Sequence, residues 1–401
     1  MAQDKATARR FGFGALTPTG PDGAGGLRPR PAVVAVVDYE PGERFSPDQD
    51  SFIKEFFSTR SQTAGAVLAE FGAPLRNVGG GGMPPIIRMS AAEHAAPEHV
   101  RVNLVGQRLV EEAFGPSTFT EHPDLVVICA DNFSPDGGAN RVAHVSVGPL
   151  NLTFDIAFFS QHASLQTRLH EVMHTMGGVD VYGHDGQRNA PHSLMSSCQV
   201  AGGRATKLPD PWHRMAWRLT EPDVWEISDL STRGLSLEIP MRSAWGSTYP
   251  TLLLWRRDHS ERECVMVELR NHTSAQGPLL LDSDTDPGFV VWLLKVGEDG
   301  VPVLRARVPA AAGNDRAILT IGSRNNLELG GWDPWCPAQG TSTVSTPELR
   351  WLDGTPTGFS LDMELDRPGD YESGTVRVSP VFGIAQARPP GMPGIKLQGI
   401  N

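Results

Sequence analysis

The chain has 401 residues, with 46 acidic and 35 basic side chains, so its formal net charge is −11 at pH 7. Nucleic acids and anionic membrane surfaces attract basic proteins, and this charge argues against both as general partners. The sequence contains no run of eighteen apolar residues, so we predict no membrane-spanning segment. Residues 1–5 lead into no apolar stretch, so we expect no secretory signal and a cytoplasmic protein.

Composition divides the chain into four parts. Residues 1–30 are rich in Gly and Pro and predict a flexible N-terminal arm, with an inhibitory pro-segment as the alternative. Residues 385–401 predict a peripheral tail that is also rich in Pro and Gly. Between these ends we expect a catalytic domain over 31–222 and a β-rich domain over 223–384.

Strands and helices alternate in the first half of the chain. The pair Ser46-Pro47 predicts a helix start, and segment 62–71 fits either a helix or a strand. Helical spacing predicts further helices at 98–114 and 209–219. Apolar runs and alternating patterns predict strands at 33–37, 85–89, 124–129, 141–147 and 153–158. This order predicts an α/β domain with a mixed sheet.

Short strands separated by turns replace the helical pattern from residue 223 onward. In one of them Phe359, Leu361 and Met363 alternate with other residues and mark one buried face. The predicted strands are 252–255, 264–269, 289–294, 317–321, 359–363 and 375–378. We therefore expect an all-β, sandwich-like second domain.

The stretch around His170 carries the strongest chemical signal. It has the pattern H-E-x-x-H-x-x-G-x-x-D, formed by His170, Glu171, His174, Gly177 and Asp180. Residues four apart share one face of a helix, so both imidazoles can bind one metal ion, and the Glu beside them can take a proton from a water molecule. The Gly allows a sharp turn that would return the Asp as a third ligand.

The same helix predicts which of its sides faces the core. Leu165, Leu169, Val172 and Met176 form an apolar stripe at helical spacing, opposite the two histidines. We therefore expect the stripe to be buried and the histidines to face a cleft. The alternative is an amphipathic helix with two surface histidines, which leaves the spacing of the Gly and the Asp unexplained.

The third ligand has an alternative interpretation. An Asp in a turn after a helix often caps the local backbone instead of binding a metal ion. If Asp180 does so, His184 or His192 would be the substitute ligand.

The motif, together with Met195 downstream, resembles the metzincin zinc peptidases, in which a Met-containing turn lies beneath the metal. Within that group the chain is most similar to the immune inhibitor A family of bacterial metallopeptidases. The similarity rests on 178–182 (Gly-Val-Asp-Val-Tyr), on 194–196 (Leu-Met-Ser), and on weaker matches across residues 31–300. Many metzincins have a Tyr two residues after the turn Met, where this chain has Ser197. Tyr182 is a substitute donor, with a packing role as the alternative.

The resemblance implies a metzincin-like catalytic domain that hydrolyses bonds in a peptide or protein substrate. A zinc-activated water would be the nucleophile and Glu171 the general base. The implied zinc ligands are His170, His174 and Asp180, and the implied supporting residues are Gly177, Tyr182 and Met195.

Two other functions stay open. One is an intracellular zinc hydrolase or biosynthetic tailoring enzyme on the same fold, acting on a small molecule or a dedicated peptide. The missing export signal favours it, because the resembling family is mostly secreted. The other is a non-catalytic binding protein on a peptidase scaffold, and the intact Glu171 argues against it.

Two further segments suggest binding. An edge strand over 141–147 would pair with an extended substrate, with a plain sheet edge as the alternative. The acidic segment 282–286 is similar to the start of a calcium loop, but an EF-hand needs a Glu at its twelfth position, where the chain has Leu293. We favour a solvated acidic loop, with Ca²⁺ binding as the alternative.

Overall fold

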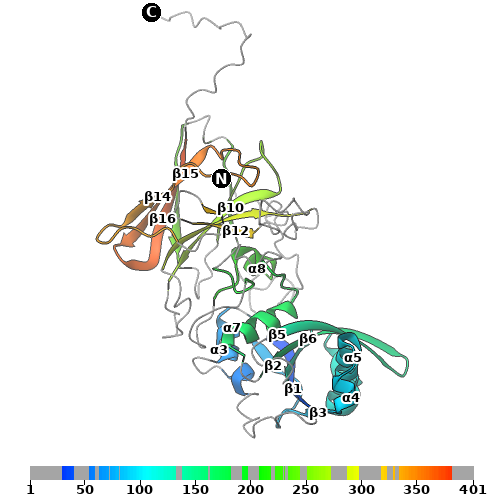
Figure 1. Ribbon diagram of the computed structural model, residues 1–401. Coiled ribbons are helices and arrows are strands. Elements are labelled where there is room, and N and C mark those ends of the chain that lie inside the picture. The colour runs from blue at the N-terminus through cyan, green and yellow to red at the C-terminus, as the bar shows by residue number, and fades with distance from the viewer. Residues whose placement is uncertain are drawn as a thin grey trace, which may run out of the picture.

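A computed structural model gives the structure of the chain, and its described residues form a mixed α/β protein with several sheets (Figure 1). Several predicted segments lie outside these residues, among them the arm up to residue 28, the helix start at Ser46, the acidic loop 282–286 and the tail. No helix in the described part has the length and apolar character needed to cross a membrane. The described residues are 29–39, 54–58, 63–71, 73–80, 82–131, 138–160, 163–181, 192–196, 207–217, 222–228, 230, 234–243, 251–271, 287–297, 318–322, 328–329 and 334–381.

A six-stranded sheet forms the centre of the N-terminal part. Its order is β2-β1-β4-β6-β5, and β3 also pairs with β1. The pairs are parallel except for β5 and β6, which run antiparallel and place β5 at the edge. The strands are β1 (Arg30–Tyr39), β2 (Leu75–Asn77), β3 (Ile86–Met89), β4 (Val126–Asp131), β5 (Gly138–Val147) and β6 (Leu150–Ser160).

Alternate residues of β1 point to opposite faces of this sheet. Ala32 and Val34 enter a core shared with the helices α3 (Ala64–Glu70) and α7 (Leu165–His174). Val33 and Ala35 enter a second core, with α5 (Glu98–Arg108). Because both faces are covered, nearly the whole strand is buried, which explains its continuous apolar run.

The helices differ in detail from the prediction. The ambiguous segment 62–71 forms α3, and its N-cap Thr63 accepts a hydrogen bond from the N–H of Ala66. The expected helix 98–114 is α5 followed by a π-helical segment, Leu109–Phe114. Helix α8 (Pro211–Ala216) is shorter than the predicted 209–219 because Asp210 caps it at its start. Two short helices are α4 (Ala91–His94) and α6 (Pro116–Glu121).

Two sheets form the part after residue 222, with orders β13-β12-β11-β10-β9-β7 and β14-β15-β16-β8. Leu254 and Val267 of the first sheet meet Leu361 and Val376 of the second in a shared core. The strands overlap the six predicted segments, whereas β7, β8, β13 and β14 were not predicted. They are β7 (Asp223–Glu226), β8 (Leu237–Arg242), β9 (Leu252–Trp255), β10 (Glu263–Arg270), β11 (Gly288–Lys295), β12 (Ile318–Gly322), β13 (Glu328–Leu329), β14 (Thr343–Ser345), β15 (Phe359–Arg367) and β16 (Asp370–Pro380).

Helix α8 lies between the N-terminal part and the β sheets (Figure 1). Its residues Trp212 and Met215 belong to the same core as Leu169 of α7. Met266 on β10 and Trp292 on β11 also belong to that core. The hydrophobic core therefore continues across residue 222, where we expected a domain boundary.

A buried ion cluster joins the same elements. Glu268 on β10 pairs with Nη1 of Arg214 on α8 at 3.1 Å and with Nη2 of Arg270 at 2.9 Å. Arg270 also donates a hydrogen bond to the carbonyl of His192. The β sheets thus contact the segment that leads to Met195.

Candidate metal centre

Helix α7 carries the motif and is buried on more than one side. Ser164 caps it by accepting a hydrogen bond from the N–H of Thr167, and the apolar stripe is buried as predicted. On the opposite side, where we expect a cleft, His170 is only 3% and Glu171 only 6% exposed. Neighbouring segments cover that side. The Asp180 side chain is 32% exposed, so the group meets solvent there.

The chain reverses directly after α7. The N–H of Gly177 bonds to the carbonyl of His174 at 2.8 Å, and that of Gly178 bonds to the carbonyl of Met173 at 3.0 Å. Gly177 has φ 85°, a conformation that favours glycine. The turn brings Asp180 back beside the helix, as the spacing predicted.

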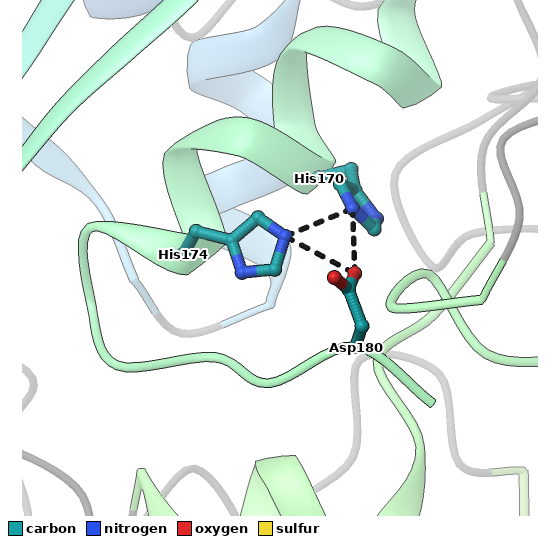
Figure 2. A group of neighbouring side chains, drawn as sticks. All are labelled: His170, His174 and Asp180. Carbon is teal, nitrogen blue, oxygen red and sulfur yellow. Dashed lines mark hydrogen bonds and ion pairs between the residues drawn. The ribbon is translucent and has the colours of Figure 1, made fainter. Parts of the chain in front are cut away.

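His170, His174 and Asp180 point toward one another (Figure 2). The Nε2 atoms of the two histidines are 3.0 Å apart. Oδ1 of Asp180 lies 3.2 Å from Nε2 of His170 and 3.3 Å from Nε2 of His174. This group could hold a metal ion with one atom from each residue.

The backbone orients both imidazoles. Nδ1–H of His170 donates to the carbonyl of Leu194 at 2.9 Å, and Nδ1–H of His174 donates to the carbonyl of Gly178 at 2.8 Å. A carbonyl oxygen only accepts, so each Nδ1 carries a hydrogen. In a neutral imidazole Nε2 then has a lone pair, which is the form that binds metal.

Hydrogen bonds hold the chain on both sides of Asp180. The N–H of Val181 bonds to the carbonyl of Met195 at 2.9 Å, and the N–H of Val179 bonds to Nε2 of His213 at 3.1 Å. Met195 is fully buried, and a Cβ on Gly178 would lie 3.0 Å from its Cε. The Met-containing segment therefore packs against the ligand loop.

The net pKa shifts of the two carboxylates are opposite in direction. Burial raises the pKa of Glu171 above its usual value, and the nearby His170 and His174 offset this only in part. Burial also raises the pKa of Asp180, but the two imidazoles outweigh it and hold that pKa well below the usual range. Asp180 is therefore an anion at neutral pH, as a ligand must be.

Among the described residues, none of the alternative ligands belongs to this group. His192 is buried with its ring centroid 6.5 Å from that of Trp292. Tyr182 and His184 lie outside the described residues.

Sequence reasoning missed several neighbours of the centre. Ser193, Asp210 and His213 form a buried network behind it. The pair Asp210-Pro211 was a readable signal, since Asp is a common N-cap and Pro a common first residue of a helix. Asp155 on β6 is half-buried and accepts from Nδ2 of Asn140 at 3.5 Å. Burial raises its pKa despite that bond and the nearby His174.

Comparison with known proteins adds no family. A scan against protein-family models finds no match for this chain, and neither does a search of curated proteins.

Proposed function

We propose that the protein is a zinc-dependent metallopeptidase. The observation that carries the proposal is the convergence of three electron-pair donors at His170, His174 and Asp180. Their ligand atoms lie 3.0–3.3 Å apart, so one cation can accept an electron pair from each of them.

The spacing of these atoms suits zinc. Bonds of about 2.0–2.1 Å to a tetrahedral zinc ion place two ligand atoms about 3.3 Å apart. Two nitrogens and one carboxylate oxygen are also a common ligand set for zinc, with the fourth position left for water. Three protein ligands are typical of catalytic sites, whereas structural zinc sites have four.

When bound, zinc would polarise the scissile carbonyl and acidify a water molecule. Glu171 takes a proton from that water as the water oxygen attacks the carbonyl carbon. It then gives the proton to the leaving amine nitrogen as the carbon–nitrogen bond breaks.

The position of β5 favours a peptide as substrate. β5 is the edge strand of its sheet among the described strands, and Gly138 at its start contacts Glu171. An edge strand can pair with an extended peptide through backbone hydrogen bonds. The backbone N–H of His144 already donates to Oδ1 of Asn103 at 2.9 Å, so it is not free to bond to a substrate. We therefore expect a peptide to pair with residues 138–143 and not with the whole of 141–147.

Digestion of a peptide library by the zinc-loaded protein and by Glu171→Gln tests the proposal. Loss of the base should lower the cleavage rate about 10²–10⁴-fold while the zinc content stays at one ion per chain. Glu112→Gln is the control, since the Glu112 side chain is 66% exposed on the π-helical segment, and it should cleave like wild type. A zinc-loaded wild type that cleaves no peptide would overturn the peptidase proposal in favour of a small-molecule hydrolase or a binding protein.

A further inference from the structure

A buried hydrogen-bond network lies behind the metal centre, and Asp210 is at its middle. Ser193, Asp210 and His213 are each 0% exposed. Oδ2 of Asp210 accepts from Oγ of Ser193 at 2.7 Å and from Nδ1 of His213 at 2.7 Å. Its other oxygen accepts the backbone N–H of His213 at 3.0 Å, which caps α8. All the hydrogen bonds of this carboxylate are therefore made inside the protein.

One arm of the network leads to His174. Nδ1 of His213 donates to Asp210, and its Nε2 accepts the N–H of Val179 at 3.1 Å. That N–H belongs to the peptide unit between Gly178 and Val179. The carbonyl of the same unit accepts from Nδ1 of His174 at 2.8 Å. A single peptide group thus connects the Asp210–His213 pair to the imidazole of a metal ligand.

The other arm leads to His170 in the same manner. Oγ of Ser193 donates to Asp210 and accepts the N–H of Met195 at 3.0 Å. That N–H belongs to the peptide unit between Leu194 and Met195. Its carbonyl accepts from Nδ1 of His170 at 2.9 Å. Each ligand histidine is therefore connected to one carboxylate oxygen through one peptide group and one side chain.

Both arms have a consistent donor direction. Each bond of an arm has its hydrogen on the side of the metal ligand, so negative charge on Asp210 polarises every link in the same sense. Hydrogen bonds in such a chain strengthen one another, and the last link makes the Nε2 of the ligand a better electron-pair donor. Ligand histidines commonly depend on outer partners in this way. A neutral Asn or Ala at position 210 would remove the source of the polarisation.

We infer that Asp210 is a shared positioning residue for both histidine ligands, acting through His213 on His174 and through Ser193 on His170. The inference rests on the metal site of the proposed function but not on the reaction performed there. His213 and Ser193 then help to orient the ligand histidines without binding the metal ion themselves. This role of Asp210 also explains why α8 packs against the ligand loop, since α8 carries His213 and is capped by Asp210.

The test is zinc affinity, measured by competition with a chelating dye on full-length protein. Ser193→Ala and His213→Leu should each weaken zinc binding about 10–100-fold, the usual effect of losing an outer partner of a ligand. His213→Gln should recover most of the affinity, because its amide can accept from Val179 and donate to Asp210. Asp210→Asn should weaken binding more than either single-arm variant. Ser193→Ala and His213→Gln remain informative if Asp210→Asn does not fold.

A second measurement separates positioning from general destabilisation. Cobalt-loaded Ser193→Ala and His213→Leu should show altered visible absorption spectra, since that spectrum reports ligand geometry. The matched control is Trp335→Phe, which deletes a buried hydrogen bond to the carbonyl of Ile321 at 2.9 Å in the β sheets. It should lower stability while leaving zinc affinity and the cobalt spectrum unchanged.

The possible results distinguish the inference from the proposed function. Wild-type zinc affinity and cobalt spectra in both Ser193→Ala and His213→Leu would overturn the inference and leave the peptidase proposal intact. A wild-type protein that binds zinc but cleaves no peptide would overturn the peptidase proposal and leave the inference intact. A wild-type protein that binds no zinc would overturn both.

Discussion

Gly138 on β5 lies directly against Glu171 on α7. A Cβ at position 138 would lie 2.5 Å from Cγ of Glu171 and 2.8 Å from its Oε1, both closer than real Cβ contacts. The backbone of the edge strand therefore forms one wall of the space that the general base occupies. This contact joins the surface expected to bind a peptide to the residue expected to cleave it.

Replacing Gly138 with Ala should displace the carboxylate of Glu171. We expect peptide cleavage to fall by at least about tenfold, because a shift of about 1 Å in a catalytic group is costly. Zinc affinity should stay within about threefold of wild type, because Gly138 takes no part in the hydrogen bonds that orient the two histidines. Gly82→Ala is the control, because a Cβ there meets nothing within 4 Å. Normal cleavage by Gly138→Ala would contradict the assigned place of Glu171.

Asp180→Ala should separate a true ligand from a nearby charge. Removal of a ligand should weaken zinc binding by more than about a hundredfold, beyond the usual effect of losing an outer partner. Asp155→Asn is the matched variant, since Asp155 is near His174 but outside the ligand group. It should change the affinity by less than about tenfold. Equal effects in dye competition would exclude Asp180 as the third ligand.

The buried Asp210 should make stability depend on acid pH. Burial raises its pKa, but the imidazole of His213 and the hydrogen bonds from His213 and Ser193 hold the pKa below its usual value. A carboxyl group with a lower pKa in the folded state stabilises the fold above its unfolded pKa of about 3.9. That contribution disappears as the pH falls through the folded pKa.

Urea unfolding of the metal-free protein, with chelator present, checks this dependence. The free energy of unfolding of the wild type should fall as the pH drops below about 4. Asp210→Asn should have a smaller free energy of unfolding at neutral pH, and it should lose less of it over the same pH range. Identical slopes against pH for the two proteins would show that Asp210 has a normal pKa in the folded state.

The Glu268 cluster should contribute to the stability of the whole chain. Glu268→Ala removes the carboxylate that pairs with the buried Arg214 and Arg270, and breaking a buried pair costs about 3–5 kcal/mol. Glu238→Ala is the comparison, because its ion pair with Arg377 is exposed and such pairs contribute less than about 1 kcal/mol. Chemical unfolding monitored by tryptophan fluorescence measures both. Equal losses would mean that the cluster is not desolvated as the structure has it.

Local patterns predicted much of the fold. The buried run 33–37 lies within β1, and the stripe from Leu165 to Met176 is buried. These predictions work because periodicity records which side of an element is covered. The ambiguous segment 62–71 could not be assigned this way, and the end of the helix at 98–114 changes to π-helix without a clear signal.

The openness of the site could not be predicted from the helix alone. A helical wheel places the histidines opposite the core stripe, but it does not say what covers that side. In the structure the carbonyl of Leu194 meets His170, and Gly138 meets Glu171. Both partners come from segments distant in sequence, so their approach depends on how the sheet and the Met195 segment pack against α7.

The sequence by itself determined which residues could bind a metal ion. His170, Glu171 and His174 share one helix, and Gly177 allows the turn that returns Asp180, so the three candidate ligands and the candidate base follow from local geometry. Only the tertiary structure decided how these residues are oriented. Peptide carbonyls orient the two histidines through hydrogen bonds. Ser193, His213 and Asp210, which lie on other segments, hold those peptide groups in place. Hydrogen bonds between segments far apart in sequence form only when the chain has packed, and no residue spacing encodes them.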